Sequence, residues 1–182
     1  MYRLVSAPFL LILAFVGELS LFKWLIAFSF FTDAIDGPLS RKFKVTSVFG
    51  ARLDSVADDA TVLTSIVALF ILELDFISSN WMSLTSLAIL FIIQTISALV
   101  AYGKVTSFHT YLAKLAAVMQ AVFFLLTFFT GEPVVIAFYL ALVITAIQLI
   151  EEIVLVIVLP KWQADIKGLY WVLTRRNSFV PK

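Results

Sequence analysis

An all-α, polytopic membrane protein is the fold class that the sequence predicts, and three features predict it. Hydrophobic residues make up 62% of the 182-residue chain and charged residues only 14%, outside the range of soluble globular domains. The apolar residues gather in six runs separated by charges and turn residues. Basic residues fall almost entirely in alternate connections between these runs. A soluble protein is therefore excluded, and no nucleic-acid partner is expected.

Each apolar run is interpreted as one transmembrane helix. A helical span needs about 20 residues, and most of the runs are close to that length. The second run is short, so it must continue through Thr32 and Asp33 to cross the bilayer. Turn residues at 78–80 and 130–133 predict two hairpins. The six runs are Leu4–Val16, Leu19–Phe31, Val56–Leu74, Trp81–Tyr102, Leu112–Phe129 and Val134–Leu159. We predict one domain over residues 1–176, followed by a frayed tail at 177–182.

Orientation follows from the lysines and arginines, because the side richer in them is cytoplasmic. With six spans, one side of the membrane holds only Lys23. The other side holds Arg3, Arg41, Lys42, Lys44, Arg52, Lys104, Lys114, Lys161, Lys167, Arg175, Arg176 and Lys182. Both termini and the connection after the second span are therefore expected in the cytoplasm.

Four aspartates at the cytoplasmic ends of the second and third spans form a dense group of carboxylates. Asp33 and Asp36 are three residues apart, and Asp54 and Asp58 are four apart, so each pair lies on one helix face. Carboxylates brought together repel one another unless a cation lies between them. The chain has no cysteine, and its one histidine, His109, is distant in sequence. This donor set favours Mg²⁺ or Mn²⁺, and two ions between the pairs would form a clamp for phosphoryl transfer.

The segment between the two pairs carries groups suited to a phosphate ligand. Arg41 offers a planar fork for phosphate oxygens, and Gly50 lets backbone or ligand approach closely. Gly37-Pro38 is expected to end the second helix. The simpler alternative is that the aspartates only cap helices or meet water, with Asp54 or Ser55 as N-cap of the third helix. For the first pair this alternative fits badly, because a helix C-terminus disfavours carboxylates.

Residues 33–58 read DAIDGPLSRKFKVTSVFGARLDSVAD. This segment resembles the signature DxxDGxxAR(x8)GxxxDxxxD of the CDP-alcohol phosphatidyltransferase family. All spacings match, and the one departure is Ser40, where the family usually has Ala. The six spans and the cytoplasmic motif also resemble the architecture of the family. The resemblance therefore extends over essentially the whole chain.

The resemblance implies a role for each matched residue. The four aspartates are similar to the metal ligands of the family, and Asp58 is similar to its general base. Gly37, Ser40, Arg41 and Gly50 match positions that surround the CDP moiety. The implied reaction transfers a phosphatidyl group from CDP-diacylglycerol to the hydroxyl of an alcohol and releases CMP.

The acceptor alcohol is predicted from a second, shorter similarity. The stretch AKLAAVMQ at 113–120 is similar to the GKxKTxxQ segment of phosphatidylglycerophosphate synthases, with Lys114 and Gln120 at matching positions and with Ala116 and Ala117 where that segment has its second Lys and its Thr. Glycerol 3-phosphate is therefore the candidate acceptor, and Lys104, His109 and Lys114 could hold its phosphate. The alternatives are positive-inside anchoring for the lysines and a loop hydrogen bond for the histidine.

Glu151 and Glu152 interrupt the last apolar run. Adjacent residues on a helix point about 100° apart, so at least one carboxylate must face away from lipid. An ionisable residue at that depth is either part of a polar, functional cavity or paired with a Lys or hydroxyl on another helix. Both alternatives stay open.

Two other classes of protein use carboxylate clusters. A membrane prenyltransferase binds Mg²⁺ through aspartate motifs, but those lie far apart on separate repeats, whereas only residues 37–53 separate Asp36 from Asp54. A divalent-cation transporter would place its acids near the middle of the membrane, facing a pore. The expected location is a bacterial cytoplasmic membrane, with the active site facing the cytoplasm. The oligomeric state is open, with a homodimer as one alternative.

Overall fold

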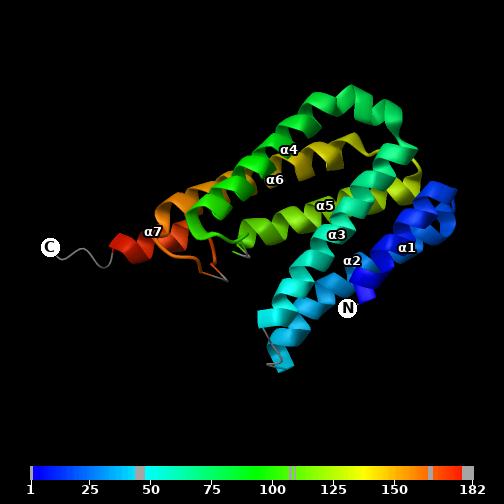
Figure 1. The fold of residues 1–182 in the computed structure, drawn as a ribbon. Helices are drawn as coiled ribbons and strands as arrows, with labels where there is room; N and C mark the ends of the chain where they lie inside the picture. Colours follow the sequence, from blue (N-terminus) through cyan, green and yellow to red (C-terminus); the bar gives the residue numbers. More distant parts are fainter. Residues whose placement is uncertain (1, 44–47, 107, 109, 164–165, 178–182) are drawn as a thin grey trace. The chain divides into compact units, whose positions relative to one another are not determined.

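The protein is described by a computed structural model whose secondary structure is helical, with no strand in the part of the chain that it describes. That part comprises the backbone of residues 2–43, 48–106, 108, 110–163 and 166–177, and the side chains of 6–32, 60–106, 108, 110–163 and 166–174. The predicted all-α fold is confirmed. The helices shown in Figure 1 are α1 (Tyr2–Val16), α2 (Leu19–Phe43), α3 (Val48–Leu72), α4 (Leu74–Tyr102), α5 (Tyr111–Thr130), α6 (Val135–Val158) and α7 (Leu169–Asn177).

The contacts divide the chain into two compact units. The first unit comprises Met1–Ser79 and Ala121–Val134, and the second comprises Asn80–Gln120 and Val135–Lys182. The first therefore contains α1, α2, α3 and the C-terminal half of α5, and the second contains most of α4, the N-terminal half of α5, α6 and α7. The prediction of a single domain over 1–176 is not tested by this division, and residues 178–182 lie outside the described part.

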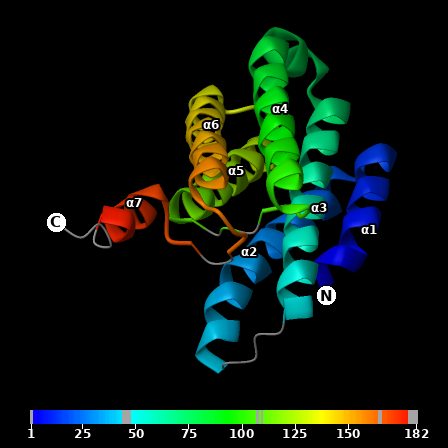
Figure 2. The same ribbon diagram turned by 60° about the vertical axis from the view of Figure 1, so that its left-hand side comes forward.

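The core of the first unit lies where α1 packs against α2 and α3 (Figure 2). Leu10, Phe22, Ile26 and Ala68 are fully buried there. The ring of Phe22 meets that of Phe128 edge to face, with their centroids 4.9 Å apart. Small side chains along the buried faces allow close approach of the helices, which is the usual basis of packing between helices in lipid.

The core of the second unit lies at the C-terminal end of α6. Phe108 and Leu155 are almost fully buried there, together with Leu159. The Tyr102 hydroxyl donates to the carbonyl oxygens of Val156 at 3.2 Å and Leu159 at 3.0 Å. The Val156 carbonyl lies in the last turn of α6 and the Leu159 carbonyl directly follows that helix, where carbonyl oxygens lack N–H partners within the helix. The end of α4 is thus fixed to the end of α6.

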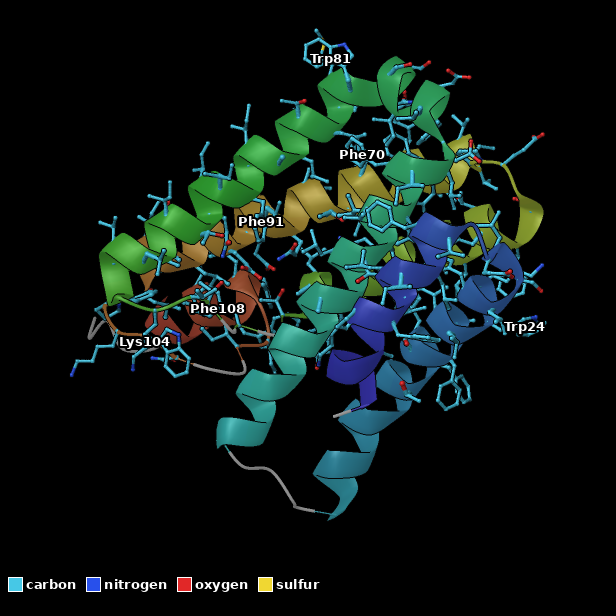
Figure 3. All side chains as sticks on the ribbon, turned by 45° about the vertical axis from the view of Figure 1, so that its right-hand side comes forward. Trp24, Phe70, Trp81, Phe91, Lys104 and Phe108 are labelled. Atoms are coloured by element: carbon cyan, nitrogen blue, oxygen red, sulfur yellow. The ribbon has the colours of Figure 1, made fainter. Side chains whose placement is uncertain are left out.

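Three of the helices, α4, α5 and α6, are long and apolar enough to cross a membrane. Only 11% to 33% of their most apolar stretches is buried within the protein, so most of this surface needs a lipid environment. Trp24 and Trp81, both more than half exposed, project away from the ribbon (Figure 3). Within the described side chains, the other apolar helical stretches are shorter, at Ser6–Val16, Leu19–Thr32 and Ala60–Leu72. The count of six spans and the side of the termini therefore stay predictions.

One of the two predicted hairpin turns is wrong. Residues 78–80 lie inside α4, and the break between α3 and α4 falls at Glu73. The hydroxyls of Ser78 and Ser79 donate back to the carbonyl oxygen of Asp75 at 2.9 and 2.8 Å, so they are satisfied within the helix. The turn at 130–133 is confirmed, since α5 ends at Thr130 and Gly131 adopts a positive φ of 79°.

Candidate active site

The aspartate motif is divided between two neighbouring helices of the first unit. Asp33, Asp36, Gly37, Ser40 and Arg41 belong to α2. Gly50, Asp54 and Asp58 belong to α3. These two helices contact one another, and the C-terminal end of α2 lies at the same end of the unit as the start of α3 (Figures 1 and 2). Asp33 therefore continues the second helix beyond its apolar run, as predicted.

One prediction and one of the alternatives, both about the ends of these helices, are wrong. Gly37-Pro38 does not end α2, which continues to Phe43. A proline inside a helix removes one backbone hydrogen bond at a cost of about 3 kcal/mol, which the remaining turns can offset. Asp54 and Ser55 are not N-caps, because α3 begins at Val48. Both pairs of aspartates therefore lie within helices, where spacings of three and four residues keep each pair on one face.

The side chains of residues 33–59 lie outside the described part of the chain. The metal site of the four aspartates and the CDP site of Gly37, Ser40, Arg41 and Gly50 therefore stay predictions. Among the side chains that are described, no group of three or more His, Cys, Asp or Glu could hold a metal ion. The donor set at the two helix ends still fits a hard divalent cation, since it offers carboxylates alone.

A buried polar network occupies the second unit. Gln94 of α4 is 3% exposed and Glu152 of α6 is 8% exposed. Gln94 Nε2 donates to Glu152 Oε2 at 2.7 Å and to Thr106 Oγ1 at 2.6 Å. Thr106 Oγ1 donates to the same Glu152 oxygen at 3.1 Å, and Gln148 Nε2 donates to Glu152 Oε1 at 2.6 Å. The partners of Glu152 therefore include a hydroxyl on another segment of the chain, as one of the two alternatives for this carboxylate required.

Glu151, the neighbouring carboxylate, contacts the start of α7. Its Oε1 accepts a hydrogen bond from the backbone N–H of Leu169, the first residue of that helix, at 2.9 Å. A helix start has N–H groups without partners inside the helix and carries a partial positive charge, so the carboxylate satisfies both. Gly168, with φ of 148°, leaves room for it, because a Cβ there would lie 3.1 Å from Glu151 Oε1.

The lysines predicted to hold the acceptor lie in the second unit as well. Lys104 and Lys114 are both exposed. The Lys104 Nζ lies 5.7 Å from the centre of the Trp162 ring, and the Lys114 Nζ lies 5.3 Å from that of Tyr111. Neither lysine forms an ion pair with any residue that the structure describes. His109 lies outside the described residues, so its role stays a prediction.

Gln120, the other position matched in the 113–120 segment, faces α6. Its Nε2 donates to Thr145 Oγ1 at 2.9 Å. Ala116, where the similar segment has a lysine, is 3% exposed. An uncompensated lysine at such a buried position would be costly, which gives a physical reason for alanine there.

Sequence reasoning did not identify Gln94, Thr106 and Gln148 as part of a site. One signal was present, because Gln94 is an isolated amide in the apolar run 81–102 and Gln148 lies one turn before Glu152. Thr106 carried no such signal. Its partner Glu152 lies 46 residues away in sequence, so only the fold brings them together.

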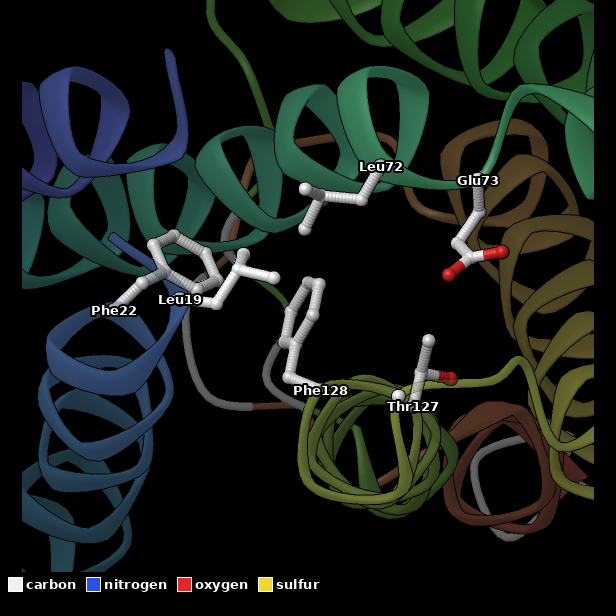
Figure 4. Close-up of a pocket in the computed structure, with 7 residues that line it drawn as sticks. Leu19, Phe22, Leu72, Glu73, Thr127 and Phe128 are labelled. Carbon is white, nitrogen blue, oxygen red and sulfur yellow. The ribbon is translucent and has the colours of Figure 1, made fainter. Parts of the chain in front are cut away.

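A small cavity of about 110 Å³ lies elsewhere in the first unit (Figure 4). Leu19, Phe22, Leu72, Glu73 and Phe128 line it, together with Thr127 and Gly131. It therefore sits at the start of α2 and the end of α3. The aspartate motif occupies the opposite ends of both helices, so this cavity is separate from the predicted metal site.

The helices and the motif together define a helical membrane protein with paired carboxylates at the ends of two neighbouring helices. The family model for CDP-alcohol phosphatidyltransferase matches residues 1–158. The chain therefore belongs to the CDP-alcohol phosphatidyltransferase family, as the resemblance of residues 33–58 indicated, and it is an integral membrane protein. A search of curated proteins and a search of solved structures found no match.

Membership of the family gives the general class of the reaction. The chain is assigned to the transferases of phospholipid biosynthesis, whose substrates are a CDP-linked compound and an alcohol. The match covers α1 to α6 and ends at Val158, so α7 lies outside it.

Proposed function

We propose that the protein transfers a phosphatidyl group from CDP-diacylglycerol to the hydroxyl of glycerol 3-phosphate and releases CMP. The observation that carries this proposal is the motif of residues 33–58, with its two aspartate pairs on the adjoining helices α2 and α3. The family match over residues 1–158 supports the same reaction class. The site would face the cytoplasm of a bacterial cell, where CMP is returned to the soluble pool.

In this proposal the four aspartates of the motif are the metal ligands. Asp33, Asp36, Asp54 and Asp58 would hold two Mg²⁺ or Mn²⁺ ions. When bound, these ions would neutralise the charge of the pyrophosphate and of the departing CMP. Without a cation the four carboxylates would repel one another and take up protons instead.

The remaining steps belong to the residues of the chain. Asp58 takes the proton of the acceptor hydroxyl, and the hydroxyl oxygen forms a bond to the phosphorus that carries the diacylglycerol. The bond from that phosphorus to the oxygen bridging the two phosphates breaks, and CMP leaves with that oxygen. Arg41 orients the phosphates through its planar fork. Gly37, Ser40 and Gly50 leave space for the CDP moiety.

The acceptor is held, in this proposal, by cations on the second unit. Lys104 and Lys114 are exposed and have no ion-pair partner among the described residues, so their charges are available to a phosphate. His109, between them in sequence, would add a further donor.

The decisive experiment offers the purified protein CDP-diacylglycerol with each of several alcohols. Glycerol 3-phosphate, serine, inositol phosphate, choline and phosphatidylglycerol form the panel, and the lipid product and CMP are measured. Formation of phosphatidylglycerophosphate with an equal amount of CMP is the expected result. A product from another alcohol would keep the reaction class and replace the acceptor. Absence of CMP with all of them would overturn the proposal.

Metal dependence is tested in the same assay. A chelator should abolish turnover, and Mg²⁺ or Mn²⁺ should restore it, because the aspartates need a cation to lie together. Turnover that persists in chelator would contradict the two-ion site.

A prenyltransferase and a cation transporter are separated from this proposal by the same measurement. Neither of them releases CMP. A prenyltransferase would release pyrophosphate from a prenyl diphosphate, and a transporter would move ions across sealed vesicles without consuming CDP-diacylglycerol.

A further inference from the structure

We propose that Glu152 is a positioning residue for the acceptor site. It acts through Thr106, whose hydroxyl it binds, and so holds the described part of the connection between α4 and α5, residues 103–106, 108 and 110. That connection carries Lys104 and leads directly into the helix that carries Lys114. The inference rests on the proposed function, because it assigns these lysines to the acceptor.

The connection is attached to the rest of the second unit at several points. Trp162 Nε1 donates to the Val105 carbonyl oxygen at 3.3 Å. Phe108, 1% exposed, packs in the core beside Leu155. Thr110 Oγ1 accepts the N–H of Ala113 at 3.0 Å, which makes it the N-cap of α5. Thr106 is the point at which this connection enters the polar network.

Glu152 suits this role because its partners are donors to both of its oxygens. Oε2 receives Gln94 Nε2 and Thr106 Oγ1, and Oε1 receives Gln148 Nε2. The Thr95 hydroxyl donates to Gln94 Oε1 at 3.3 Å, which orients the Gln94 amide so that its Nε2 faces Glu152 Oε2 and Thr106 Oγ1. A carboxyl group that is hydrogen-bonded at both of its oxygens is held in one orientation. The network thus fixes the position of the Thr106 side chain and the direction of its hydroxyl.

Glu152 is too enclosed to be the group that binds the acceptor. Its side chain is 8% exposed, whereas Lys104 and Lys114 are exposed. Lys104 lies only two residues before Thr106, and its Nζ rests over the Trp162 ring. Moving the Thr106 backbone would therefore displace the Lys104 ammonium without removing any charge. Binding of the acceptor should suffer, and the chemical step should not.

The first test compares Thr106→Val with Thr106→Ser, using glycerol 3-phosphate as the acceptor. Valine keeps the shape of threonine and loses the hydroxyl, and serine keeps the hydroxyl. Thr106→Val should raise the KM for glycerol 3-phosphate roughly tenfold, because it removes the hydrogen bond that holds the connection to Glu152. The kcat and the KM for CDP-diacylglycerol should change by less than about twofold. Thr106→Ser should restore the acceptor KM.

The second test changes the carboxylate itself. Glu152→Gln keeps the size and one acceptor oxygen, so a smaller rise in the same KM is expected, and Glu152→Leu should give the larger rise. Tyr139→Phe is the matched control, because it removes another hydrogen bond between α6 and α4, from the Tyr139 hydroxyl to Asn80 Oδ1 at 3.0 Å. This control should leave the acceptor KM unchanged.

Hydrogen exchange of the 103–110 segment gives a readout that needs no turnover. Thr106→Val should speed exchange there, and Tyr139→Phe should not. Unchanged exchange, or an acceptor KM that Thr106→Val leaves at the value of the unmodified protein, would overturn the positioning role. Failure of the unmodified protein to release CMP with any alcohol would instead overturn the proposed function.

Discussion

Asp58 is the single residue on which turnover should depend most steeply. It lies one turn after Asp54 on α3, within a helix that is continuous from Val48 to Leu72. The next residue, Asp59, occupies a position about 100° further round the same helix. Two carboxylates that adjoin in sequence are therefore expected to differ sharply in function.

Asp58→Asn should lower turnover by roughly 10² to 10⁴, the range typical of a lost general base, because an amide cannot accept the hydroxyl proton. Binding of CDP-diacylglycerol should be largely kept, since one oxygen remains for the metal. Asp59→Asn is the matched control and should be mild. Steady-state kinetics of both variants tests the assignment. A more damaging effect of Asp59→Asn would show that the assignment of the general base to Asp58 is wrong.

Arg41 is expected to recognise phosphate by its shape as well as its charge. Arg41→Lys keeps the positive charge and loses the planar fork, so the KM for CDP-diacylglycerol should rise several-fold. Lys42→Arg, at the next position of α2, is a charge-conserving control that should have little effect. Unchanged kinetics in Arg41→Lys would reduce this residue to a membrane-anchoring charge.

At the scale of the helices, local sequence signals predict some helix ends well and others poorly. The apolar runs 112–129 and 134–159 agree closely with α5 and α6, because Gly131 provides a left-handed residue between them. The run 19–31 could not give the end of α2, since polar residues extend that helix to Phe43. Local breakers such as Gly37-Pro38 were overridden there, and tertiary packing commonly has that effect.

Helix α7 was not predicted, because the interaction at its start is tertiary. The carboxylate at its N-terminus comes from Glu151, 18 residues earlier in the chain. The partners of Glu152 were equally hidden, since Gln94 lies 58 residues away. The sequence could indicate that this pair of carboxylates needs polar surroundings. It could not indicate which residues supply them, because residues so far apart in sequence come into contact only in the folded protein.

Gly168→Ala should weaken α7 in particular. Its φ of 148° is strained for any residue with a side chain, and the new Cβ would lie 3.1 Å from Glu151 Oε1. A loss of about 1–3 kcal/mol of stability is expected from the strain alone. Gly131→Ala provides the comparison, because a Cβ there meets nothing within 4 Å. Thermal unfolding in detergent should show the larger decrease for Gly168→Ala, and equal decreases would contradict the role of the contact with Glu151.

At the scale of the whole molecule, the uneven distribution of basic residues between the connections predicts the orientation of the protein in the membrane. Lys44 follows the second predicted span, and Glu132 lies in the turn between α5 and α6. The chain has no cysteine, so a single introduced cysteine is a unique chemical label. With six spans these two positions lie on opposite sides of the membrane.

Lys44→Cys should be labelled by an impermeant thiol reagent only after the cells are opened, and Glu132→Cys should be labelled in intact cells. The reason is that basic connections are retained in the cytoplasm. Labelling of Lys44→Cys from outside would show that the orientation is the reverse of the predicted one. The aspartate motif would then lie on the side of the membrane opposite to cytoplasmic CMP.

The two neighbouring carboxylates of α6 also restrict how this helix can change in length. Glu151 accepts a hydrogen bond from the start of α7, and Glu152 accepts one from the connection before α5. Both contacts therefore depend on the same rotational position of α6 about its axis. A one-residue insertion shortly before this pair would turn both side chains by about 100° and misdirect them together. An insertion of four residues would nearly restore the direction but shift them about 6 Å along the axis. Insertions and deletions in the second half of α6 should therefore be tolerated far less well than in the turn at 131–134, of which residues 131 and 132 are exposed.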